Sequence, residues 1–214
     1  MPAKNNYYID LKKMDYNRCL KLQYDLVNLR EENKIPDTIV FVEHNNVYTI
    51  GRKADPENYK NINVIKTDRG GDVTYHGEGQ LVAYFIFDVN IDGKREIRKF
   101  LEKIENSYIG MLNNNGYEAM LDEEPGIWIN TANGKKKVAS VGLAIKDHIS
   151  YHGVAMNINE RSLYGFRMIN PCGMNSNIMS YIKMERENAI DQLLKSFAGY
   201  FGEFEKIELN DILI

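Results

Sequence analysis

The chain has 214 residues, of which 43% are hydrophobic, so it is long enough to bury one sizeable core. Its formal net charge of −3 gives general nucleic-acid binding no electrostatic support. The longest strongly apolar run, residues 81–88, is too short to cross a membrane, and residues 1–8 lack the basic-then-apolar pattern of a signal peptide. We therefore expect one cytoplasmic domain over residues 1–214, without linkers or repeats.

Hydrophobic periodicity and clusters of β-branched residues indicate a mixture of strands and helices. In chain order they predict a strand at 6–11, a helix at 15–33, strands at 37–41, 47–50, 63–67 and 81–89, a helix at 94–114, strands at 126–130, 137–145 and 150–159, and a helix at 188–201. A turn at Asn133-Gly134 joins two strands as a hairpin. Because hairpins recur, we expect an α/β fold of the α+β type and not a doubly wound parallel sheet.

Residues 69–80 contain four glycines among polar side chains, and the apolar strand at 81–89 follows directly. The segment reads Arg69-Gly70-Gly71-Asp72-Val73-Thr74-Tyr75-His76-Gly77-Glu78-Gly79-Gln80. Glycine lets a backbone approach a ligand closely, and binding residues are often carried on loops. The pattern indicates a ligand-binding loop.

A lysine opens the apolar segment Lys137-Val138-Ala139-Ser140-Val141-Gly142. Three consecutive lysines near a turn usually form a solvated tip, and we expect this of Lys135 and Lys136. Lys137 adjoins the strand, so its amine is expected to be buried, where desolvation lowers the pKa and permits proton transfer near neutrality.

The chain has two cysteines, which cannot form a disulfide framework and do not have metal-ligand spacing, so we expect a reducing compartment and no bound metal. Cys19 lies on an apolar helical stripe and is expected to be a buried core residue. Cys172 lies between Pro171, which restrains the backbone, and Gly173, which leaves the approach open. Cys172 is therefore the candidate nucleophile.

Two histidines, His76 and His152, each lie in a Tyr-His-Gly triplet. Taken alone, each is more often a hydrogen-bonded structural histidine than a catalyst. Together with Cys172 they also fit a cysteine hydrolase.

Four segments resemble, in the same order, the octanoyltransferases of lipoate biosynthesis, also called lipoyl(octanoyl) transferases. The family patterns are E-H-x-x-V-[YF]-T-x-G-R, R-G-G-x-V-T-Y-H-G-P-G-Q-L, K-[IL]-A-S-[IL]-G, and [ST]-[FY]-H-G-x-A-[LI]-N-x-[ND] followed by I-x-P-C-G. They match residues 43–52, 69–81, 137–142 and 150–174. The resemblance implies the fold of the biotin/lipoate protein ligases: a mixed, mainly antiparallel sheet with packed helices.

The resemblance also implies that an octanoyl group passes from octanoyl-acyl carrier protein to a specific lysine of a lipoyl domain, through a thioester on Cys172. The acceptors would be lipoyl domains of 2-oxoacid dehydrogenases and the H protein of glycine cleavage. Lys137 would activate Cys172 and accept the proton of the acceptor lysine. No cofactor, nucleic acid or membrane is implied, because the thioester arrives activated. Backbone N–H groups of residues 70–79 or of Gly173 are candidates to hold the oxyanion.

The substrate-binding residues implied by the resemblance are Arg69, Gly70, Gly71, Thr74, Tyr75, His76, Gly77, Gly79, Gln80, Ser140, Val141, Gly142, His152, Gly153 and Ala155. One departure is Glu78, which stands where the family has proline. Glu78 would have no effect on acyl binding if it faced solvent, and it would weaken acyl binding if it faced the pocket.

Three alternatives stay open. An ATP-dependent lipoate–protein ligase also uses a lysine, but such ligases carry R-R-x-[ST]-G-G-G-x-V-[FY]-H-D-x-G-N, where this chain has two glycines and Gly77 after His76. A cysteine thioesterase or hydrolase would pair Cys172 with His152. A lipoyl-domain binding module would have no catalysis.

Overall fold

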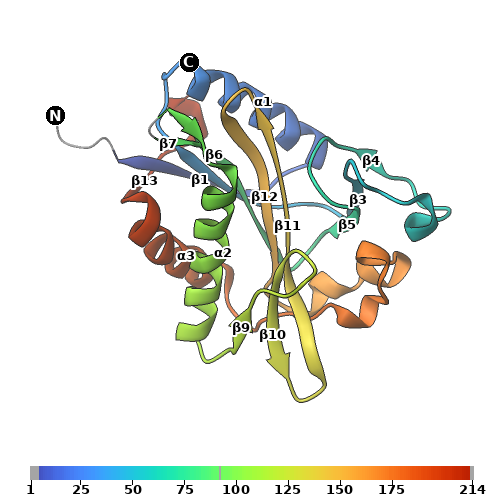
Figure 1. Ribbon diagram of the computed structural model, residues 1–214. Helices are drawn as coiled ribbons and strands as arrows, with labels where there is room; N and C mark the ends of the chain where they lie inside the picture. The colour runs from blue at the N-terminus through green and yellow to red at the C-terminus, as the bar shows by residue number, and fades with distance from the viewer. Residues whose placement is uncertain (1–4, 92, 213–214) are drawn as a thin grey trace.

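The computed structural model describes residues 5–91 and 93–212, and at residues 91 and 172 it describes the backbone only. Over this part of the chain, eight strands form a large sheet in the order β13-β1-β2-β6-β12-β11-β10-β9 (Figure 1). Strand β1 runs parallel to both of its neighbours, and the other pairs are antiparallel. The strands are β1 (Asn6–Lys13), β2 (Thr38–Glu43), β6 (Gln80–Ile86), β9 (Ala119–Met120), β10 (Ile127–Thr131), β11 (Gly134–Lys146), β12 (Ile149–Asn157) and β13 (Phe204–Lys206).

Helices cover both faces of this sheet (Figure 1). Helices α2 (Ile97–Asn114) and α3 (Arg186–Phe201) pack on one face, and α1 (Tyr16–Glu31) packs on the other. Strand β6 is apolar throughout because its side chains are buried alternately on the two sides: Phe85 lies against α3, and Val82 lies on the α1 side. None of the helices in the described residues combines the length and hydrophobicity needed to cross a bilayer.

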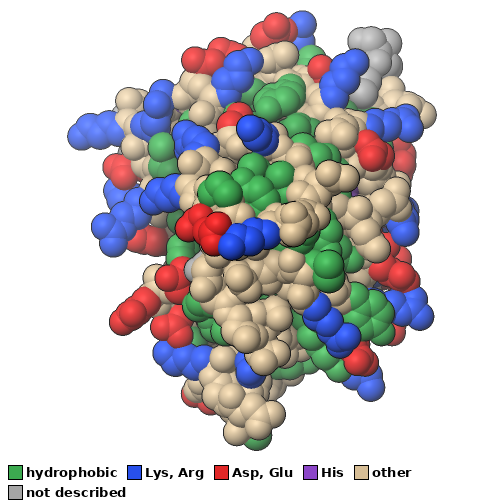
Figure 2. Space-filling view, turned by 90° about the vertical axis from the view of Figure 1, so that its right-hand side faces the viewer, with side chains coloured by type: hydrophobic (Ala, Val, Ile, Leu, Met, Phe, Trp, Pro, Cys, Tyr) green, Lys and Arg blue, Asp and Glu red, His purple; other side chains and the backbone are tan. Residues whose placement is uncertain are grey.

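A small sheet, β4-β3-β5, lies beside the large one, at the right of Figure 1. Its strands are β3 (Val47–Ile50), β4 (Ile65–Lys66) and β5 (Val73–His76). It packs on 3-10 turns at Glu160–Leu163, Gly165–Met168, Pro171–Gly173 and Ser176–Ile178. Figure 2 shows this side of the molecule, where hydrophobic side chains are interspersed with basic and acidic ones. A short hairpin, β7 (Asn90–Ile91) and β8 (Lys94–Arg95), precedes α2.

The predicted α+β architecture is confirmed, and so are the long strands and helices to within a few residues. Two predictions were wrong in detail. Val73–His76 form strand β5 within the predicted loop, because they pair with β3. Helix α2 begins at Ile97 and not at Lys94, because Lys94 and Arg95 pair with β7. Strands β9 and β13 were not predicted, because they are too short to give a period-two pattern.

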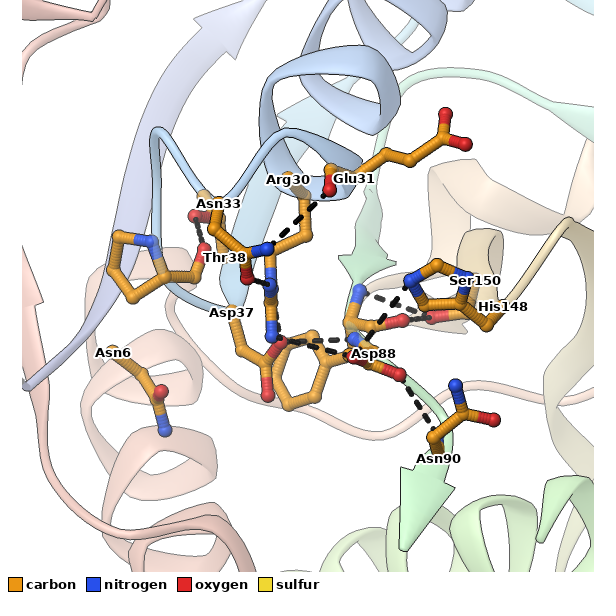
Figure 3. Close-up of polar contacts among 12 residues, drawn as sticks. Asn6, Arg30, Glu31, Asn33, Asp37, Thr38, Asp88, Asn90, His148 and Ser150 are labelled. Atoms are coloured by element: carbon orange, nitrogen blue, oxygen red, sulfur yellow. Dashed lines mark hydrogen bonds and ion pairs between the residues drawn. The ribbon is translucent and has the colours of Figure 1, made fainter. Parts of the chain in front are cut away.

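A polar cluster fastens α1 to one end of the large sheet (Figure 3). Arg30 Nε donates to Asp37 Oδ1 at 2.8 Å, and the backbone N–H of Asp88 donates to the same oxygen at 2.9 Å. His148, in the turn between β11 and β12, lies with Nε2 3.9 Å from Asp88 Oδ2. Burial raises the pKa of Asp37, against the opposing effect of Arg30. The cluster joins the C-terminal end of α1 to the ends of β2, β6 and β12.

Candidate active site

A cavity of about 410 Å³ lies on the α1 side of the large sheet, between β6, β11, β12 and the small sheet. Residues of the three central strands and of α1 that line it are Tyr16, Val82, Tyr84, Lys137, Ser140, Val141, Gly142, His152, Gly153, Val154 and Ala155. The small sheet and the loops contribute Lys53, Asn58, Arg69, Gly71, Asp72, Val73, Thr74, His76, Glu124, Pro125 and Pro171.

A β-bulge turns Lys137 into the cavity. Trp128 pairs with Lys137 but Ile127 pairs with Ala139, so Val138 is an extra residue in β11. Val138 and Ala139 both pack in the core under α2 and α3, as expected when a bulge interrupts the alternation. Lys137 consequently lines the same cavity as Ser140, three positions along the strand.

Lys137 is only 3% exposed, in agreement with the burial expected from the sequence. Its Nζ lies 5.9 Å from the centre of the Trp128 ring. Gly126, with φ +138°, makes room for it, because a Cβ there would lie 2.4 Å from Lys137 Cε. The preceding residues Glu124 and Pro125 line the cavity beside it.

His152 enters the cavity through a backbone irregularity in β12. Its φ is +57°, in the left-handed region that is uncommon for residues other than glycine. Val154 and Met156, at alternate positions, face the core under α2 and α3, so a regular strand would send His152 there too. The left-handed turn instead places its ring beside those of Tyr84 and Tyr151, on the α1 side. Its backbone N–H donates to Gln23 Oε1 of α1 at 2.9 Å.

Asp68 holds the His152 ring in place. Its Oδ1 lies 2.9 Å from His152 Nε2, and its Oδ2 accepts a hydrogen bond from the Tyr151 hydroxyl. A carboxylate accepts, so Nε2 carries the proton and Nδ1 does not when the ring is neutral. Burial lowers the pKa of His152, and Asp68 opposes that shift.

Tyrosine and histidine rings close the α1 side of the cavity. Tyr16 stacks on His76, with ring centres 5.7 Å apart. His44 Nδ1 lies 2.8 Å from the Met14 carbonyl, so this nitrogen donates, and Nε2 accepts from the Tyr84 hydroxyl at 2.8 Å. Burial raises the pKa of Tyr16 to about 12 and that of Tyr84 well above its usual value, and it lowers those of His44 and His76. This wall is therefore neutral at pH 7 and compatible with an apolar ligand.

Arg69 and its neighbours cover the cavity. The Arg69 guanidinium donates to the carbonyls of Gly70 and Thr49, each at 2.9 Å, and Gly70 N–H donates to the Leu143 carbonyl of β11 at 3.0 Å. These bonds hold the residue 69–71 backbone across the sheet. Thr74 is 8% exposed, and its hydroxyl makes no hydrogen bond among the described residues, so it is positioned to bind a ligand.

The backbone at Cys172 is tied to the glycine-rich segment. Pro171–Gly173 form a single 3-10 turn, and Pro171 lines the cavity. The carbonyl of Asn58 accepts from the Asn170 N–H at 2.9 Å, and Asn58 Nδ2 donates to Asp72 Oδ2 at 2.6 Å. The side chain of Cys172 lies outside the described part of the structure.

Ten of the predicted binding residues line the cavity: Arg69, Gly71, Thr74, His76, Ser140, Val141, Gly142, His152, Gly153 and Ala155. The other five do not, and they are Gly70, Tyr75, Gly77, Gly79 and Gln80. The Tyr75 hydroxyl instead donates to Asn46 Oδ1 at 2.8 Å, and Gln80 Nε2 donates to Asn157 Oδ1 at 3.0 Å. Their contacts support β5 and β6 from outside the cavity.

Several suggested oxyanion donors are already engaged. Gly70 N–H is bonded to Leu143, Gly79 N–H donates to Glu43 Oε2 at 3.0 Å, and Gly173 N–H donates to the Asn170 carbonyl at 3.0 Å. Glu78 is exposed and forms an ion pair with Arg161, so the carboxylate at the proline position faces solvent.

The sequence did not single out Asp68, Tyr16, Tyr84 or Asn58. Asp68 directly precedes the glycine-rich segment, but an isolated aspartate carries no signal of its partner. In the sequence, Tyr16 and Tyr84 occupy positions that look like ordinary apolar positions of a helix and of a strand. Asp68 and Tyr84 meet at the His152 ring, Tyr16 meets His76, and Asn58 meets Asp72, and all of these contacts are tertiary.

Comparison with known proteins gives one family over most of the chain. The model of the lipoyl protein ligase A/B catalytic domain matches residues 15–201. The octanoyltransferase of Dictyoglomus thermophilum is 39% identical over 81% of this chain and 75% of its own length. That of Caldicellulosiruptor saccharolyticus is 34% identical over 94% of this chain and 92% of its own.

A solved structure from the lipoylation system of Thermoplasma acidophilum, described as a bi-partite lipoate protein ligase and its E2 lipoyl domain, superposes with a TM-score of 0.71. It is 15% identical, over 96% of this chain and 88% of that one. This likeness confirms the predicted ligase-like fold.

Proposed function

Because this chain belongs to the lipoyl protein ligase A/B catalytic domain family, we propose that it is an octanoyltransferase of protein lipoylation. The donor is octanoyl-acyl carrier protein, and the acceptor is a specific lysine on lipoyl domains of 2-oxoacid dehydrogenases and of the glycine cleavage H protein. Residues 1–214 act as one catalytic domain. A cytoplasmic location stays a prediction of the sequence.

The single observation that supports this chemistry best is the burial of Lys137 in a cavity that Pro171 also lines. A buried amine in the cavity that the Cys172 turn borders suits a nucleophile that must lose a proton and a leaving group that must gain one. The neutral rings of Tyr16, His76 and Tyr84 give the cavity a wall on which an acyl chain can pack.

In the first half-reaction, the Cys172 thiolate attacks the thioester carbonyl, and the carrier thiol leaves with the proton that Lys137 took from Cys172. Little bond energy is needed, because one thioester replaces another. In the second half-reaction, the amine of the acceptor lysine attacks octanoyl-Cys172. An amide forms, the Cys172 sulfur leaves, and Lys137 takes the proton that the amine loses.

The solved structure with this fold is described as a ligase, but its 15% identity to this chain supports only the assignment of the fold. The octanoyltransferase relatives, at 39% and 34% identity, favour transfer over ligation. So does the sequence, since Gly77 occupies the place of the ligase aspartate.

Incubation of the purified protein with octanoyl-acyl carrier protein, followed by intact mass measurement, tests the proposal. We expect one added octanoyl group, which moves to a lipoyl domain when that is supplied. Release of free octanoate without transfer would instead identify a thioesterase. Binding of the lipoyl domain with no acylation at all would identify a binding module.

A further inference from the structure

Small residues on β11 and β12 form the floor of a channel that leads away from Lys137. On the cavity face of these strands, Ser140 pairs with Ala155, and the next pair is Gly142 with Gly153. Neither pair has a side chain larger than a hydroxymethyl group. Arg69 and Gly70 cover the strand at Gly142, where a Cβ would lie 3.2 Å from Arg69 Cδ and 3.3 Å from the Gly70 carbonyl oxygen. A slender ligand therefore has its room over Ser140 and Ala155 and toward β6, where Val82 and Tyr84 line the cavity.

The channel ends at His152. The next pair on this face is Ala144 with Tyr151, and the left-handed backbone puts the His152 ring there as well. His152 is 2% exposed and is fixed from two sides, by Asp68 at Nε2 and by Gln23 at the backbone N–H. Gly70, bonded to the Leu143 carbonyl, brings the covering loop across β11 at the same level.

The register gives the length of the channel. His152 pairs with Leu143, which is six positions beyond Lys137, and one of these is the bulged residue Val138. Five regular steps of a strand span roughly 16 Å. An extended eight-carbon acyl chain fits this span, with room for the Lys137 side chain at one end and the His152 ring at the other.

Resting on the proposed octanoyl transfer, we propose that His152 is the residue that limits acyl chain length. A longer chain must displace a ring that is hydrogen-bonded, buried and held in a strained backbone conformation, which a packed wall resists. A shorter chain leaves part of the channel unfilled and loses the burial of its missing methylenes. The preference for eight carbons then follows from the distance between Lys137 and His152.

The test measures kcat/KM for hexanoyl, octanoyl, decanoyl and dodecanoyl thioesters of acyl carrier protein. Glycine tolerates the positive φ at this position, so His152→Gly is the first variant. We expect its ratio of kcat/KM for decanoyl to kcat/KM for octanoyl donors to rise about tenfold, because two more methylenes can then be buried. His152→Asn also tolerates this backbone conformation, and we expect it to shift the ratio in the same direction by a smaller amount. If the glycine variant does not fold, His152→Asn decides the question.

His148→Gly is the matched control. It removes the same ring from the same hairpin, but His148 lies beside Asp88 in the cluster of Figure 3, outside the cavity residues. Its chain-length profile should equal that of the parent. An unchanged profile in both His152 variants, with octanoyl transfer intact, would overturn the length limit and leave the proposed function standing. A parent that forms no acyl adduct from any donor would overturn the proposed function itself.

Discussion

The Nζ of Lys137 lies 5.9 Å from the centre of the Trp128 ring, on the neighbouring strand β10. The bulge at Val138 produces this placement, since it turns the lysine toward the cavity while the next two residues of β11, Val138 and Ala139, face the core. The two lysines before it have different surroundings. Lys135 is paired with Asp122 at 2.9 Å, and Lys136 Nζ donates to the Asn177 carbonyl at 2.7 Å, both at the exposed surface.

Replacing Lys137 with alanine should lower acyl transfer by at least about 100-fold, because general acid–base catalysis contributes that much. Lys137→Arg should fail as well, since a guanidinium keeps its proton at any working pH. Steady-state transfer to a lipoyl domain is the measurement, with Lys135→Ala and Lys136→Ala as controls within a few-fold of the parent. Near-parental activity in Lys137→Arg would show that the position supplies only positive charge.

The acyl adduct should form on Cys172 and not on Cys19. Cys19 has no exposed surface, and burial raises the pKa of its thiol to about 12, so its thiolate is scarce at neutral pH. We expect Cys19→Ser to retain a hydroxylamine-sensitive octanoyl adduct and Cys172→Ser to lose it. Peptide mapping that finds the octanoyl group on Cys19 would contradict the mechanism.

Transfer should need neither ATP nor magnesium, because the donor thioester is already activated. Octanoate with ATP should be a poor substrate, since the Gly70-Gly71 and His76-Gly77 segments depart from the ligase pattern. The rates with octanoyl-acyl carrier protein alone and with octanoate plus ATP, measured side by side, decide this. Efficient turnover of free octanoate or lipoate would place the chain among the ligases.

The link from Asp72 through Asn58 to Asn170 should control how well Cys172 is positioned. Asn58→Ala removes the 2.6 Å hydrogen bond to Asp72, and we expect acylation to slow by roughly three- to tenfold through misplacement of the nucleophile. The burst phase of acyl-enzyme formation reports this step. Glu57→Ala, an exposed change in the same 3-10 turn, is the control. Equal burst rates in the two variants would remove Asn58 from this role.

The sequence was sufficient for the long elements because their patterns are local. The apolar spacing of α2 indicates that one face of the helix is buried, and the continuous apolar run of β6 indicates that both faces of the strand are buried. Strand β5 was missed because glycine-rich polar sequence resembles a loop, and only its pairing with β3 makes it a strand.

The site could be predicted where side chains follow the regular alternation of a strand, and it could not where they depart from it. Strand alternation correctly groups Ser140 with Gly142, but it would send His152 to the opposite face. The bulge at Val138 depends on the pairing of β10 with β11, and the left-handed φ of His152 is accompanied by its contacts to Gln23 and Asp68. No local sequence pattern indicates either feature.

The pH dependence of stability should contain a contribution from Asp10, which joins β1 to the start of α3. Both Asp10 oxygens accept hydrogen bonds from the Arg186 guanidinium. Burial disfavours the Asp10 carboxylate, but the bonds from Arg186 and Lys12 outweigh it and lower its pKa from 3.8 to about 2.

Since the folded-state pKa of Asp10 is depressed, its contribution to the free energy of unfolding is present above pH 3.8 and is lost as the pH falls toward 2. Asp10→Asn should therefore lower the free energy of unfolding by about 1–2 kcal/mol at pH 7, a value discounted for partial solvent screening. Urea unfolding of parent and variant from pH 7 down to pH 3 should show the difference shrinking below pH 4. Asp191→Asn, a substitution at an exposed position of α3, should change the free energy of unfolding little at any pH. A pH-independent difference for Asp10→Asn would mean that lost packing, and not the ionised carboxylate, joins β1 to α3.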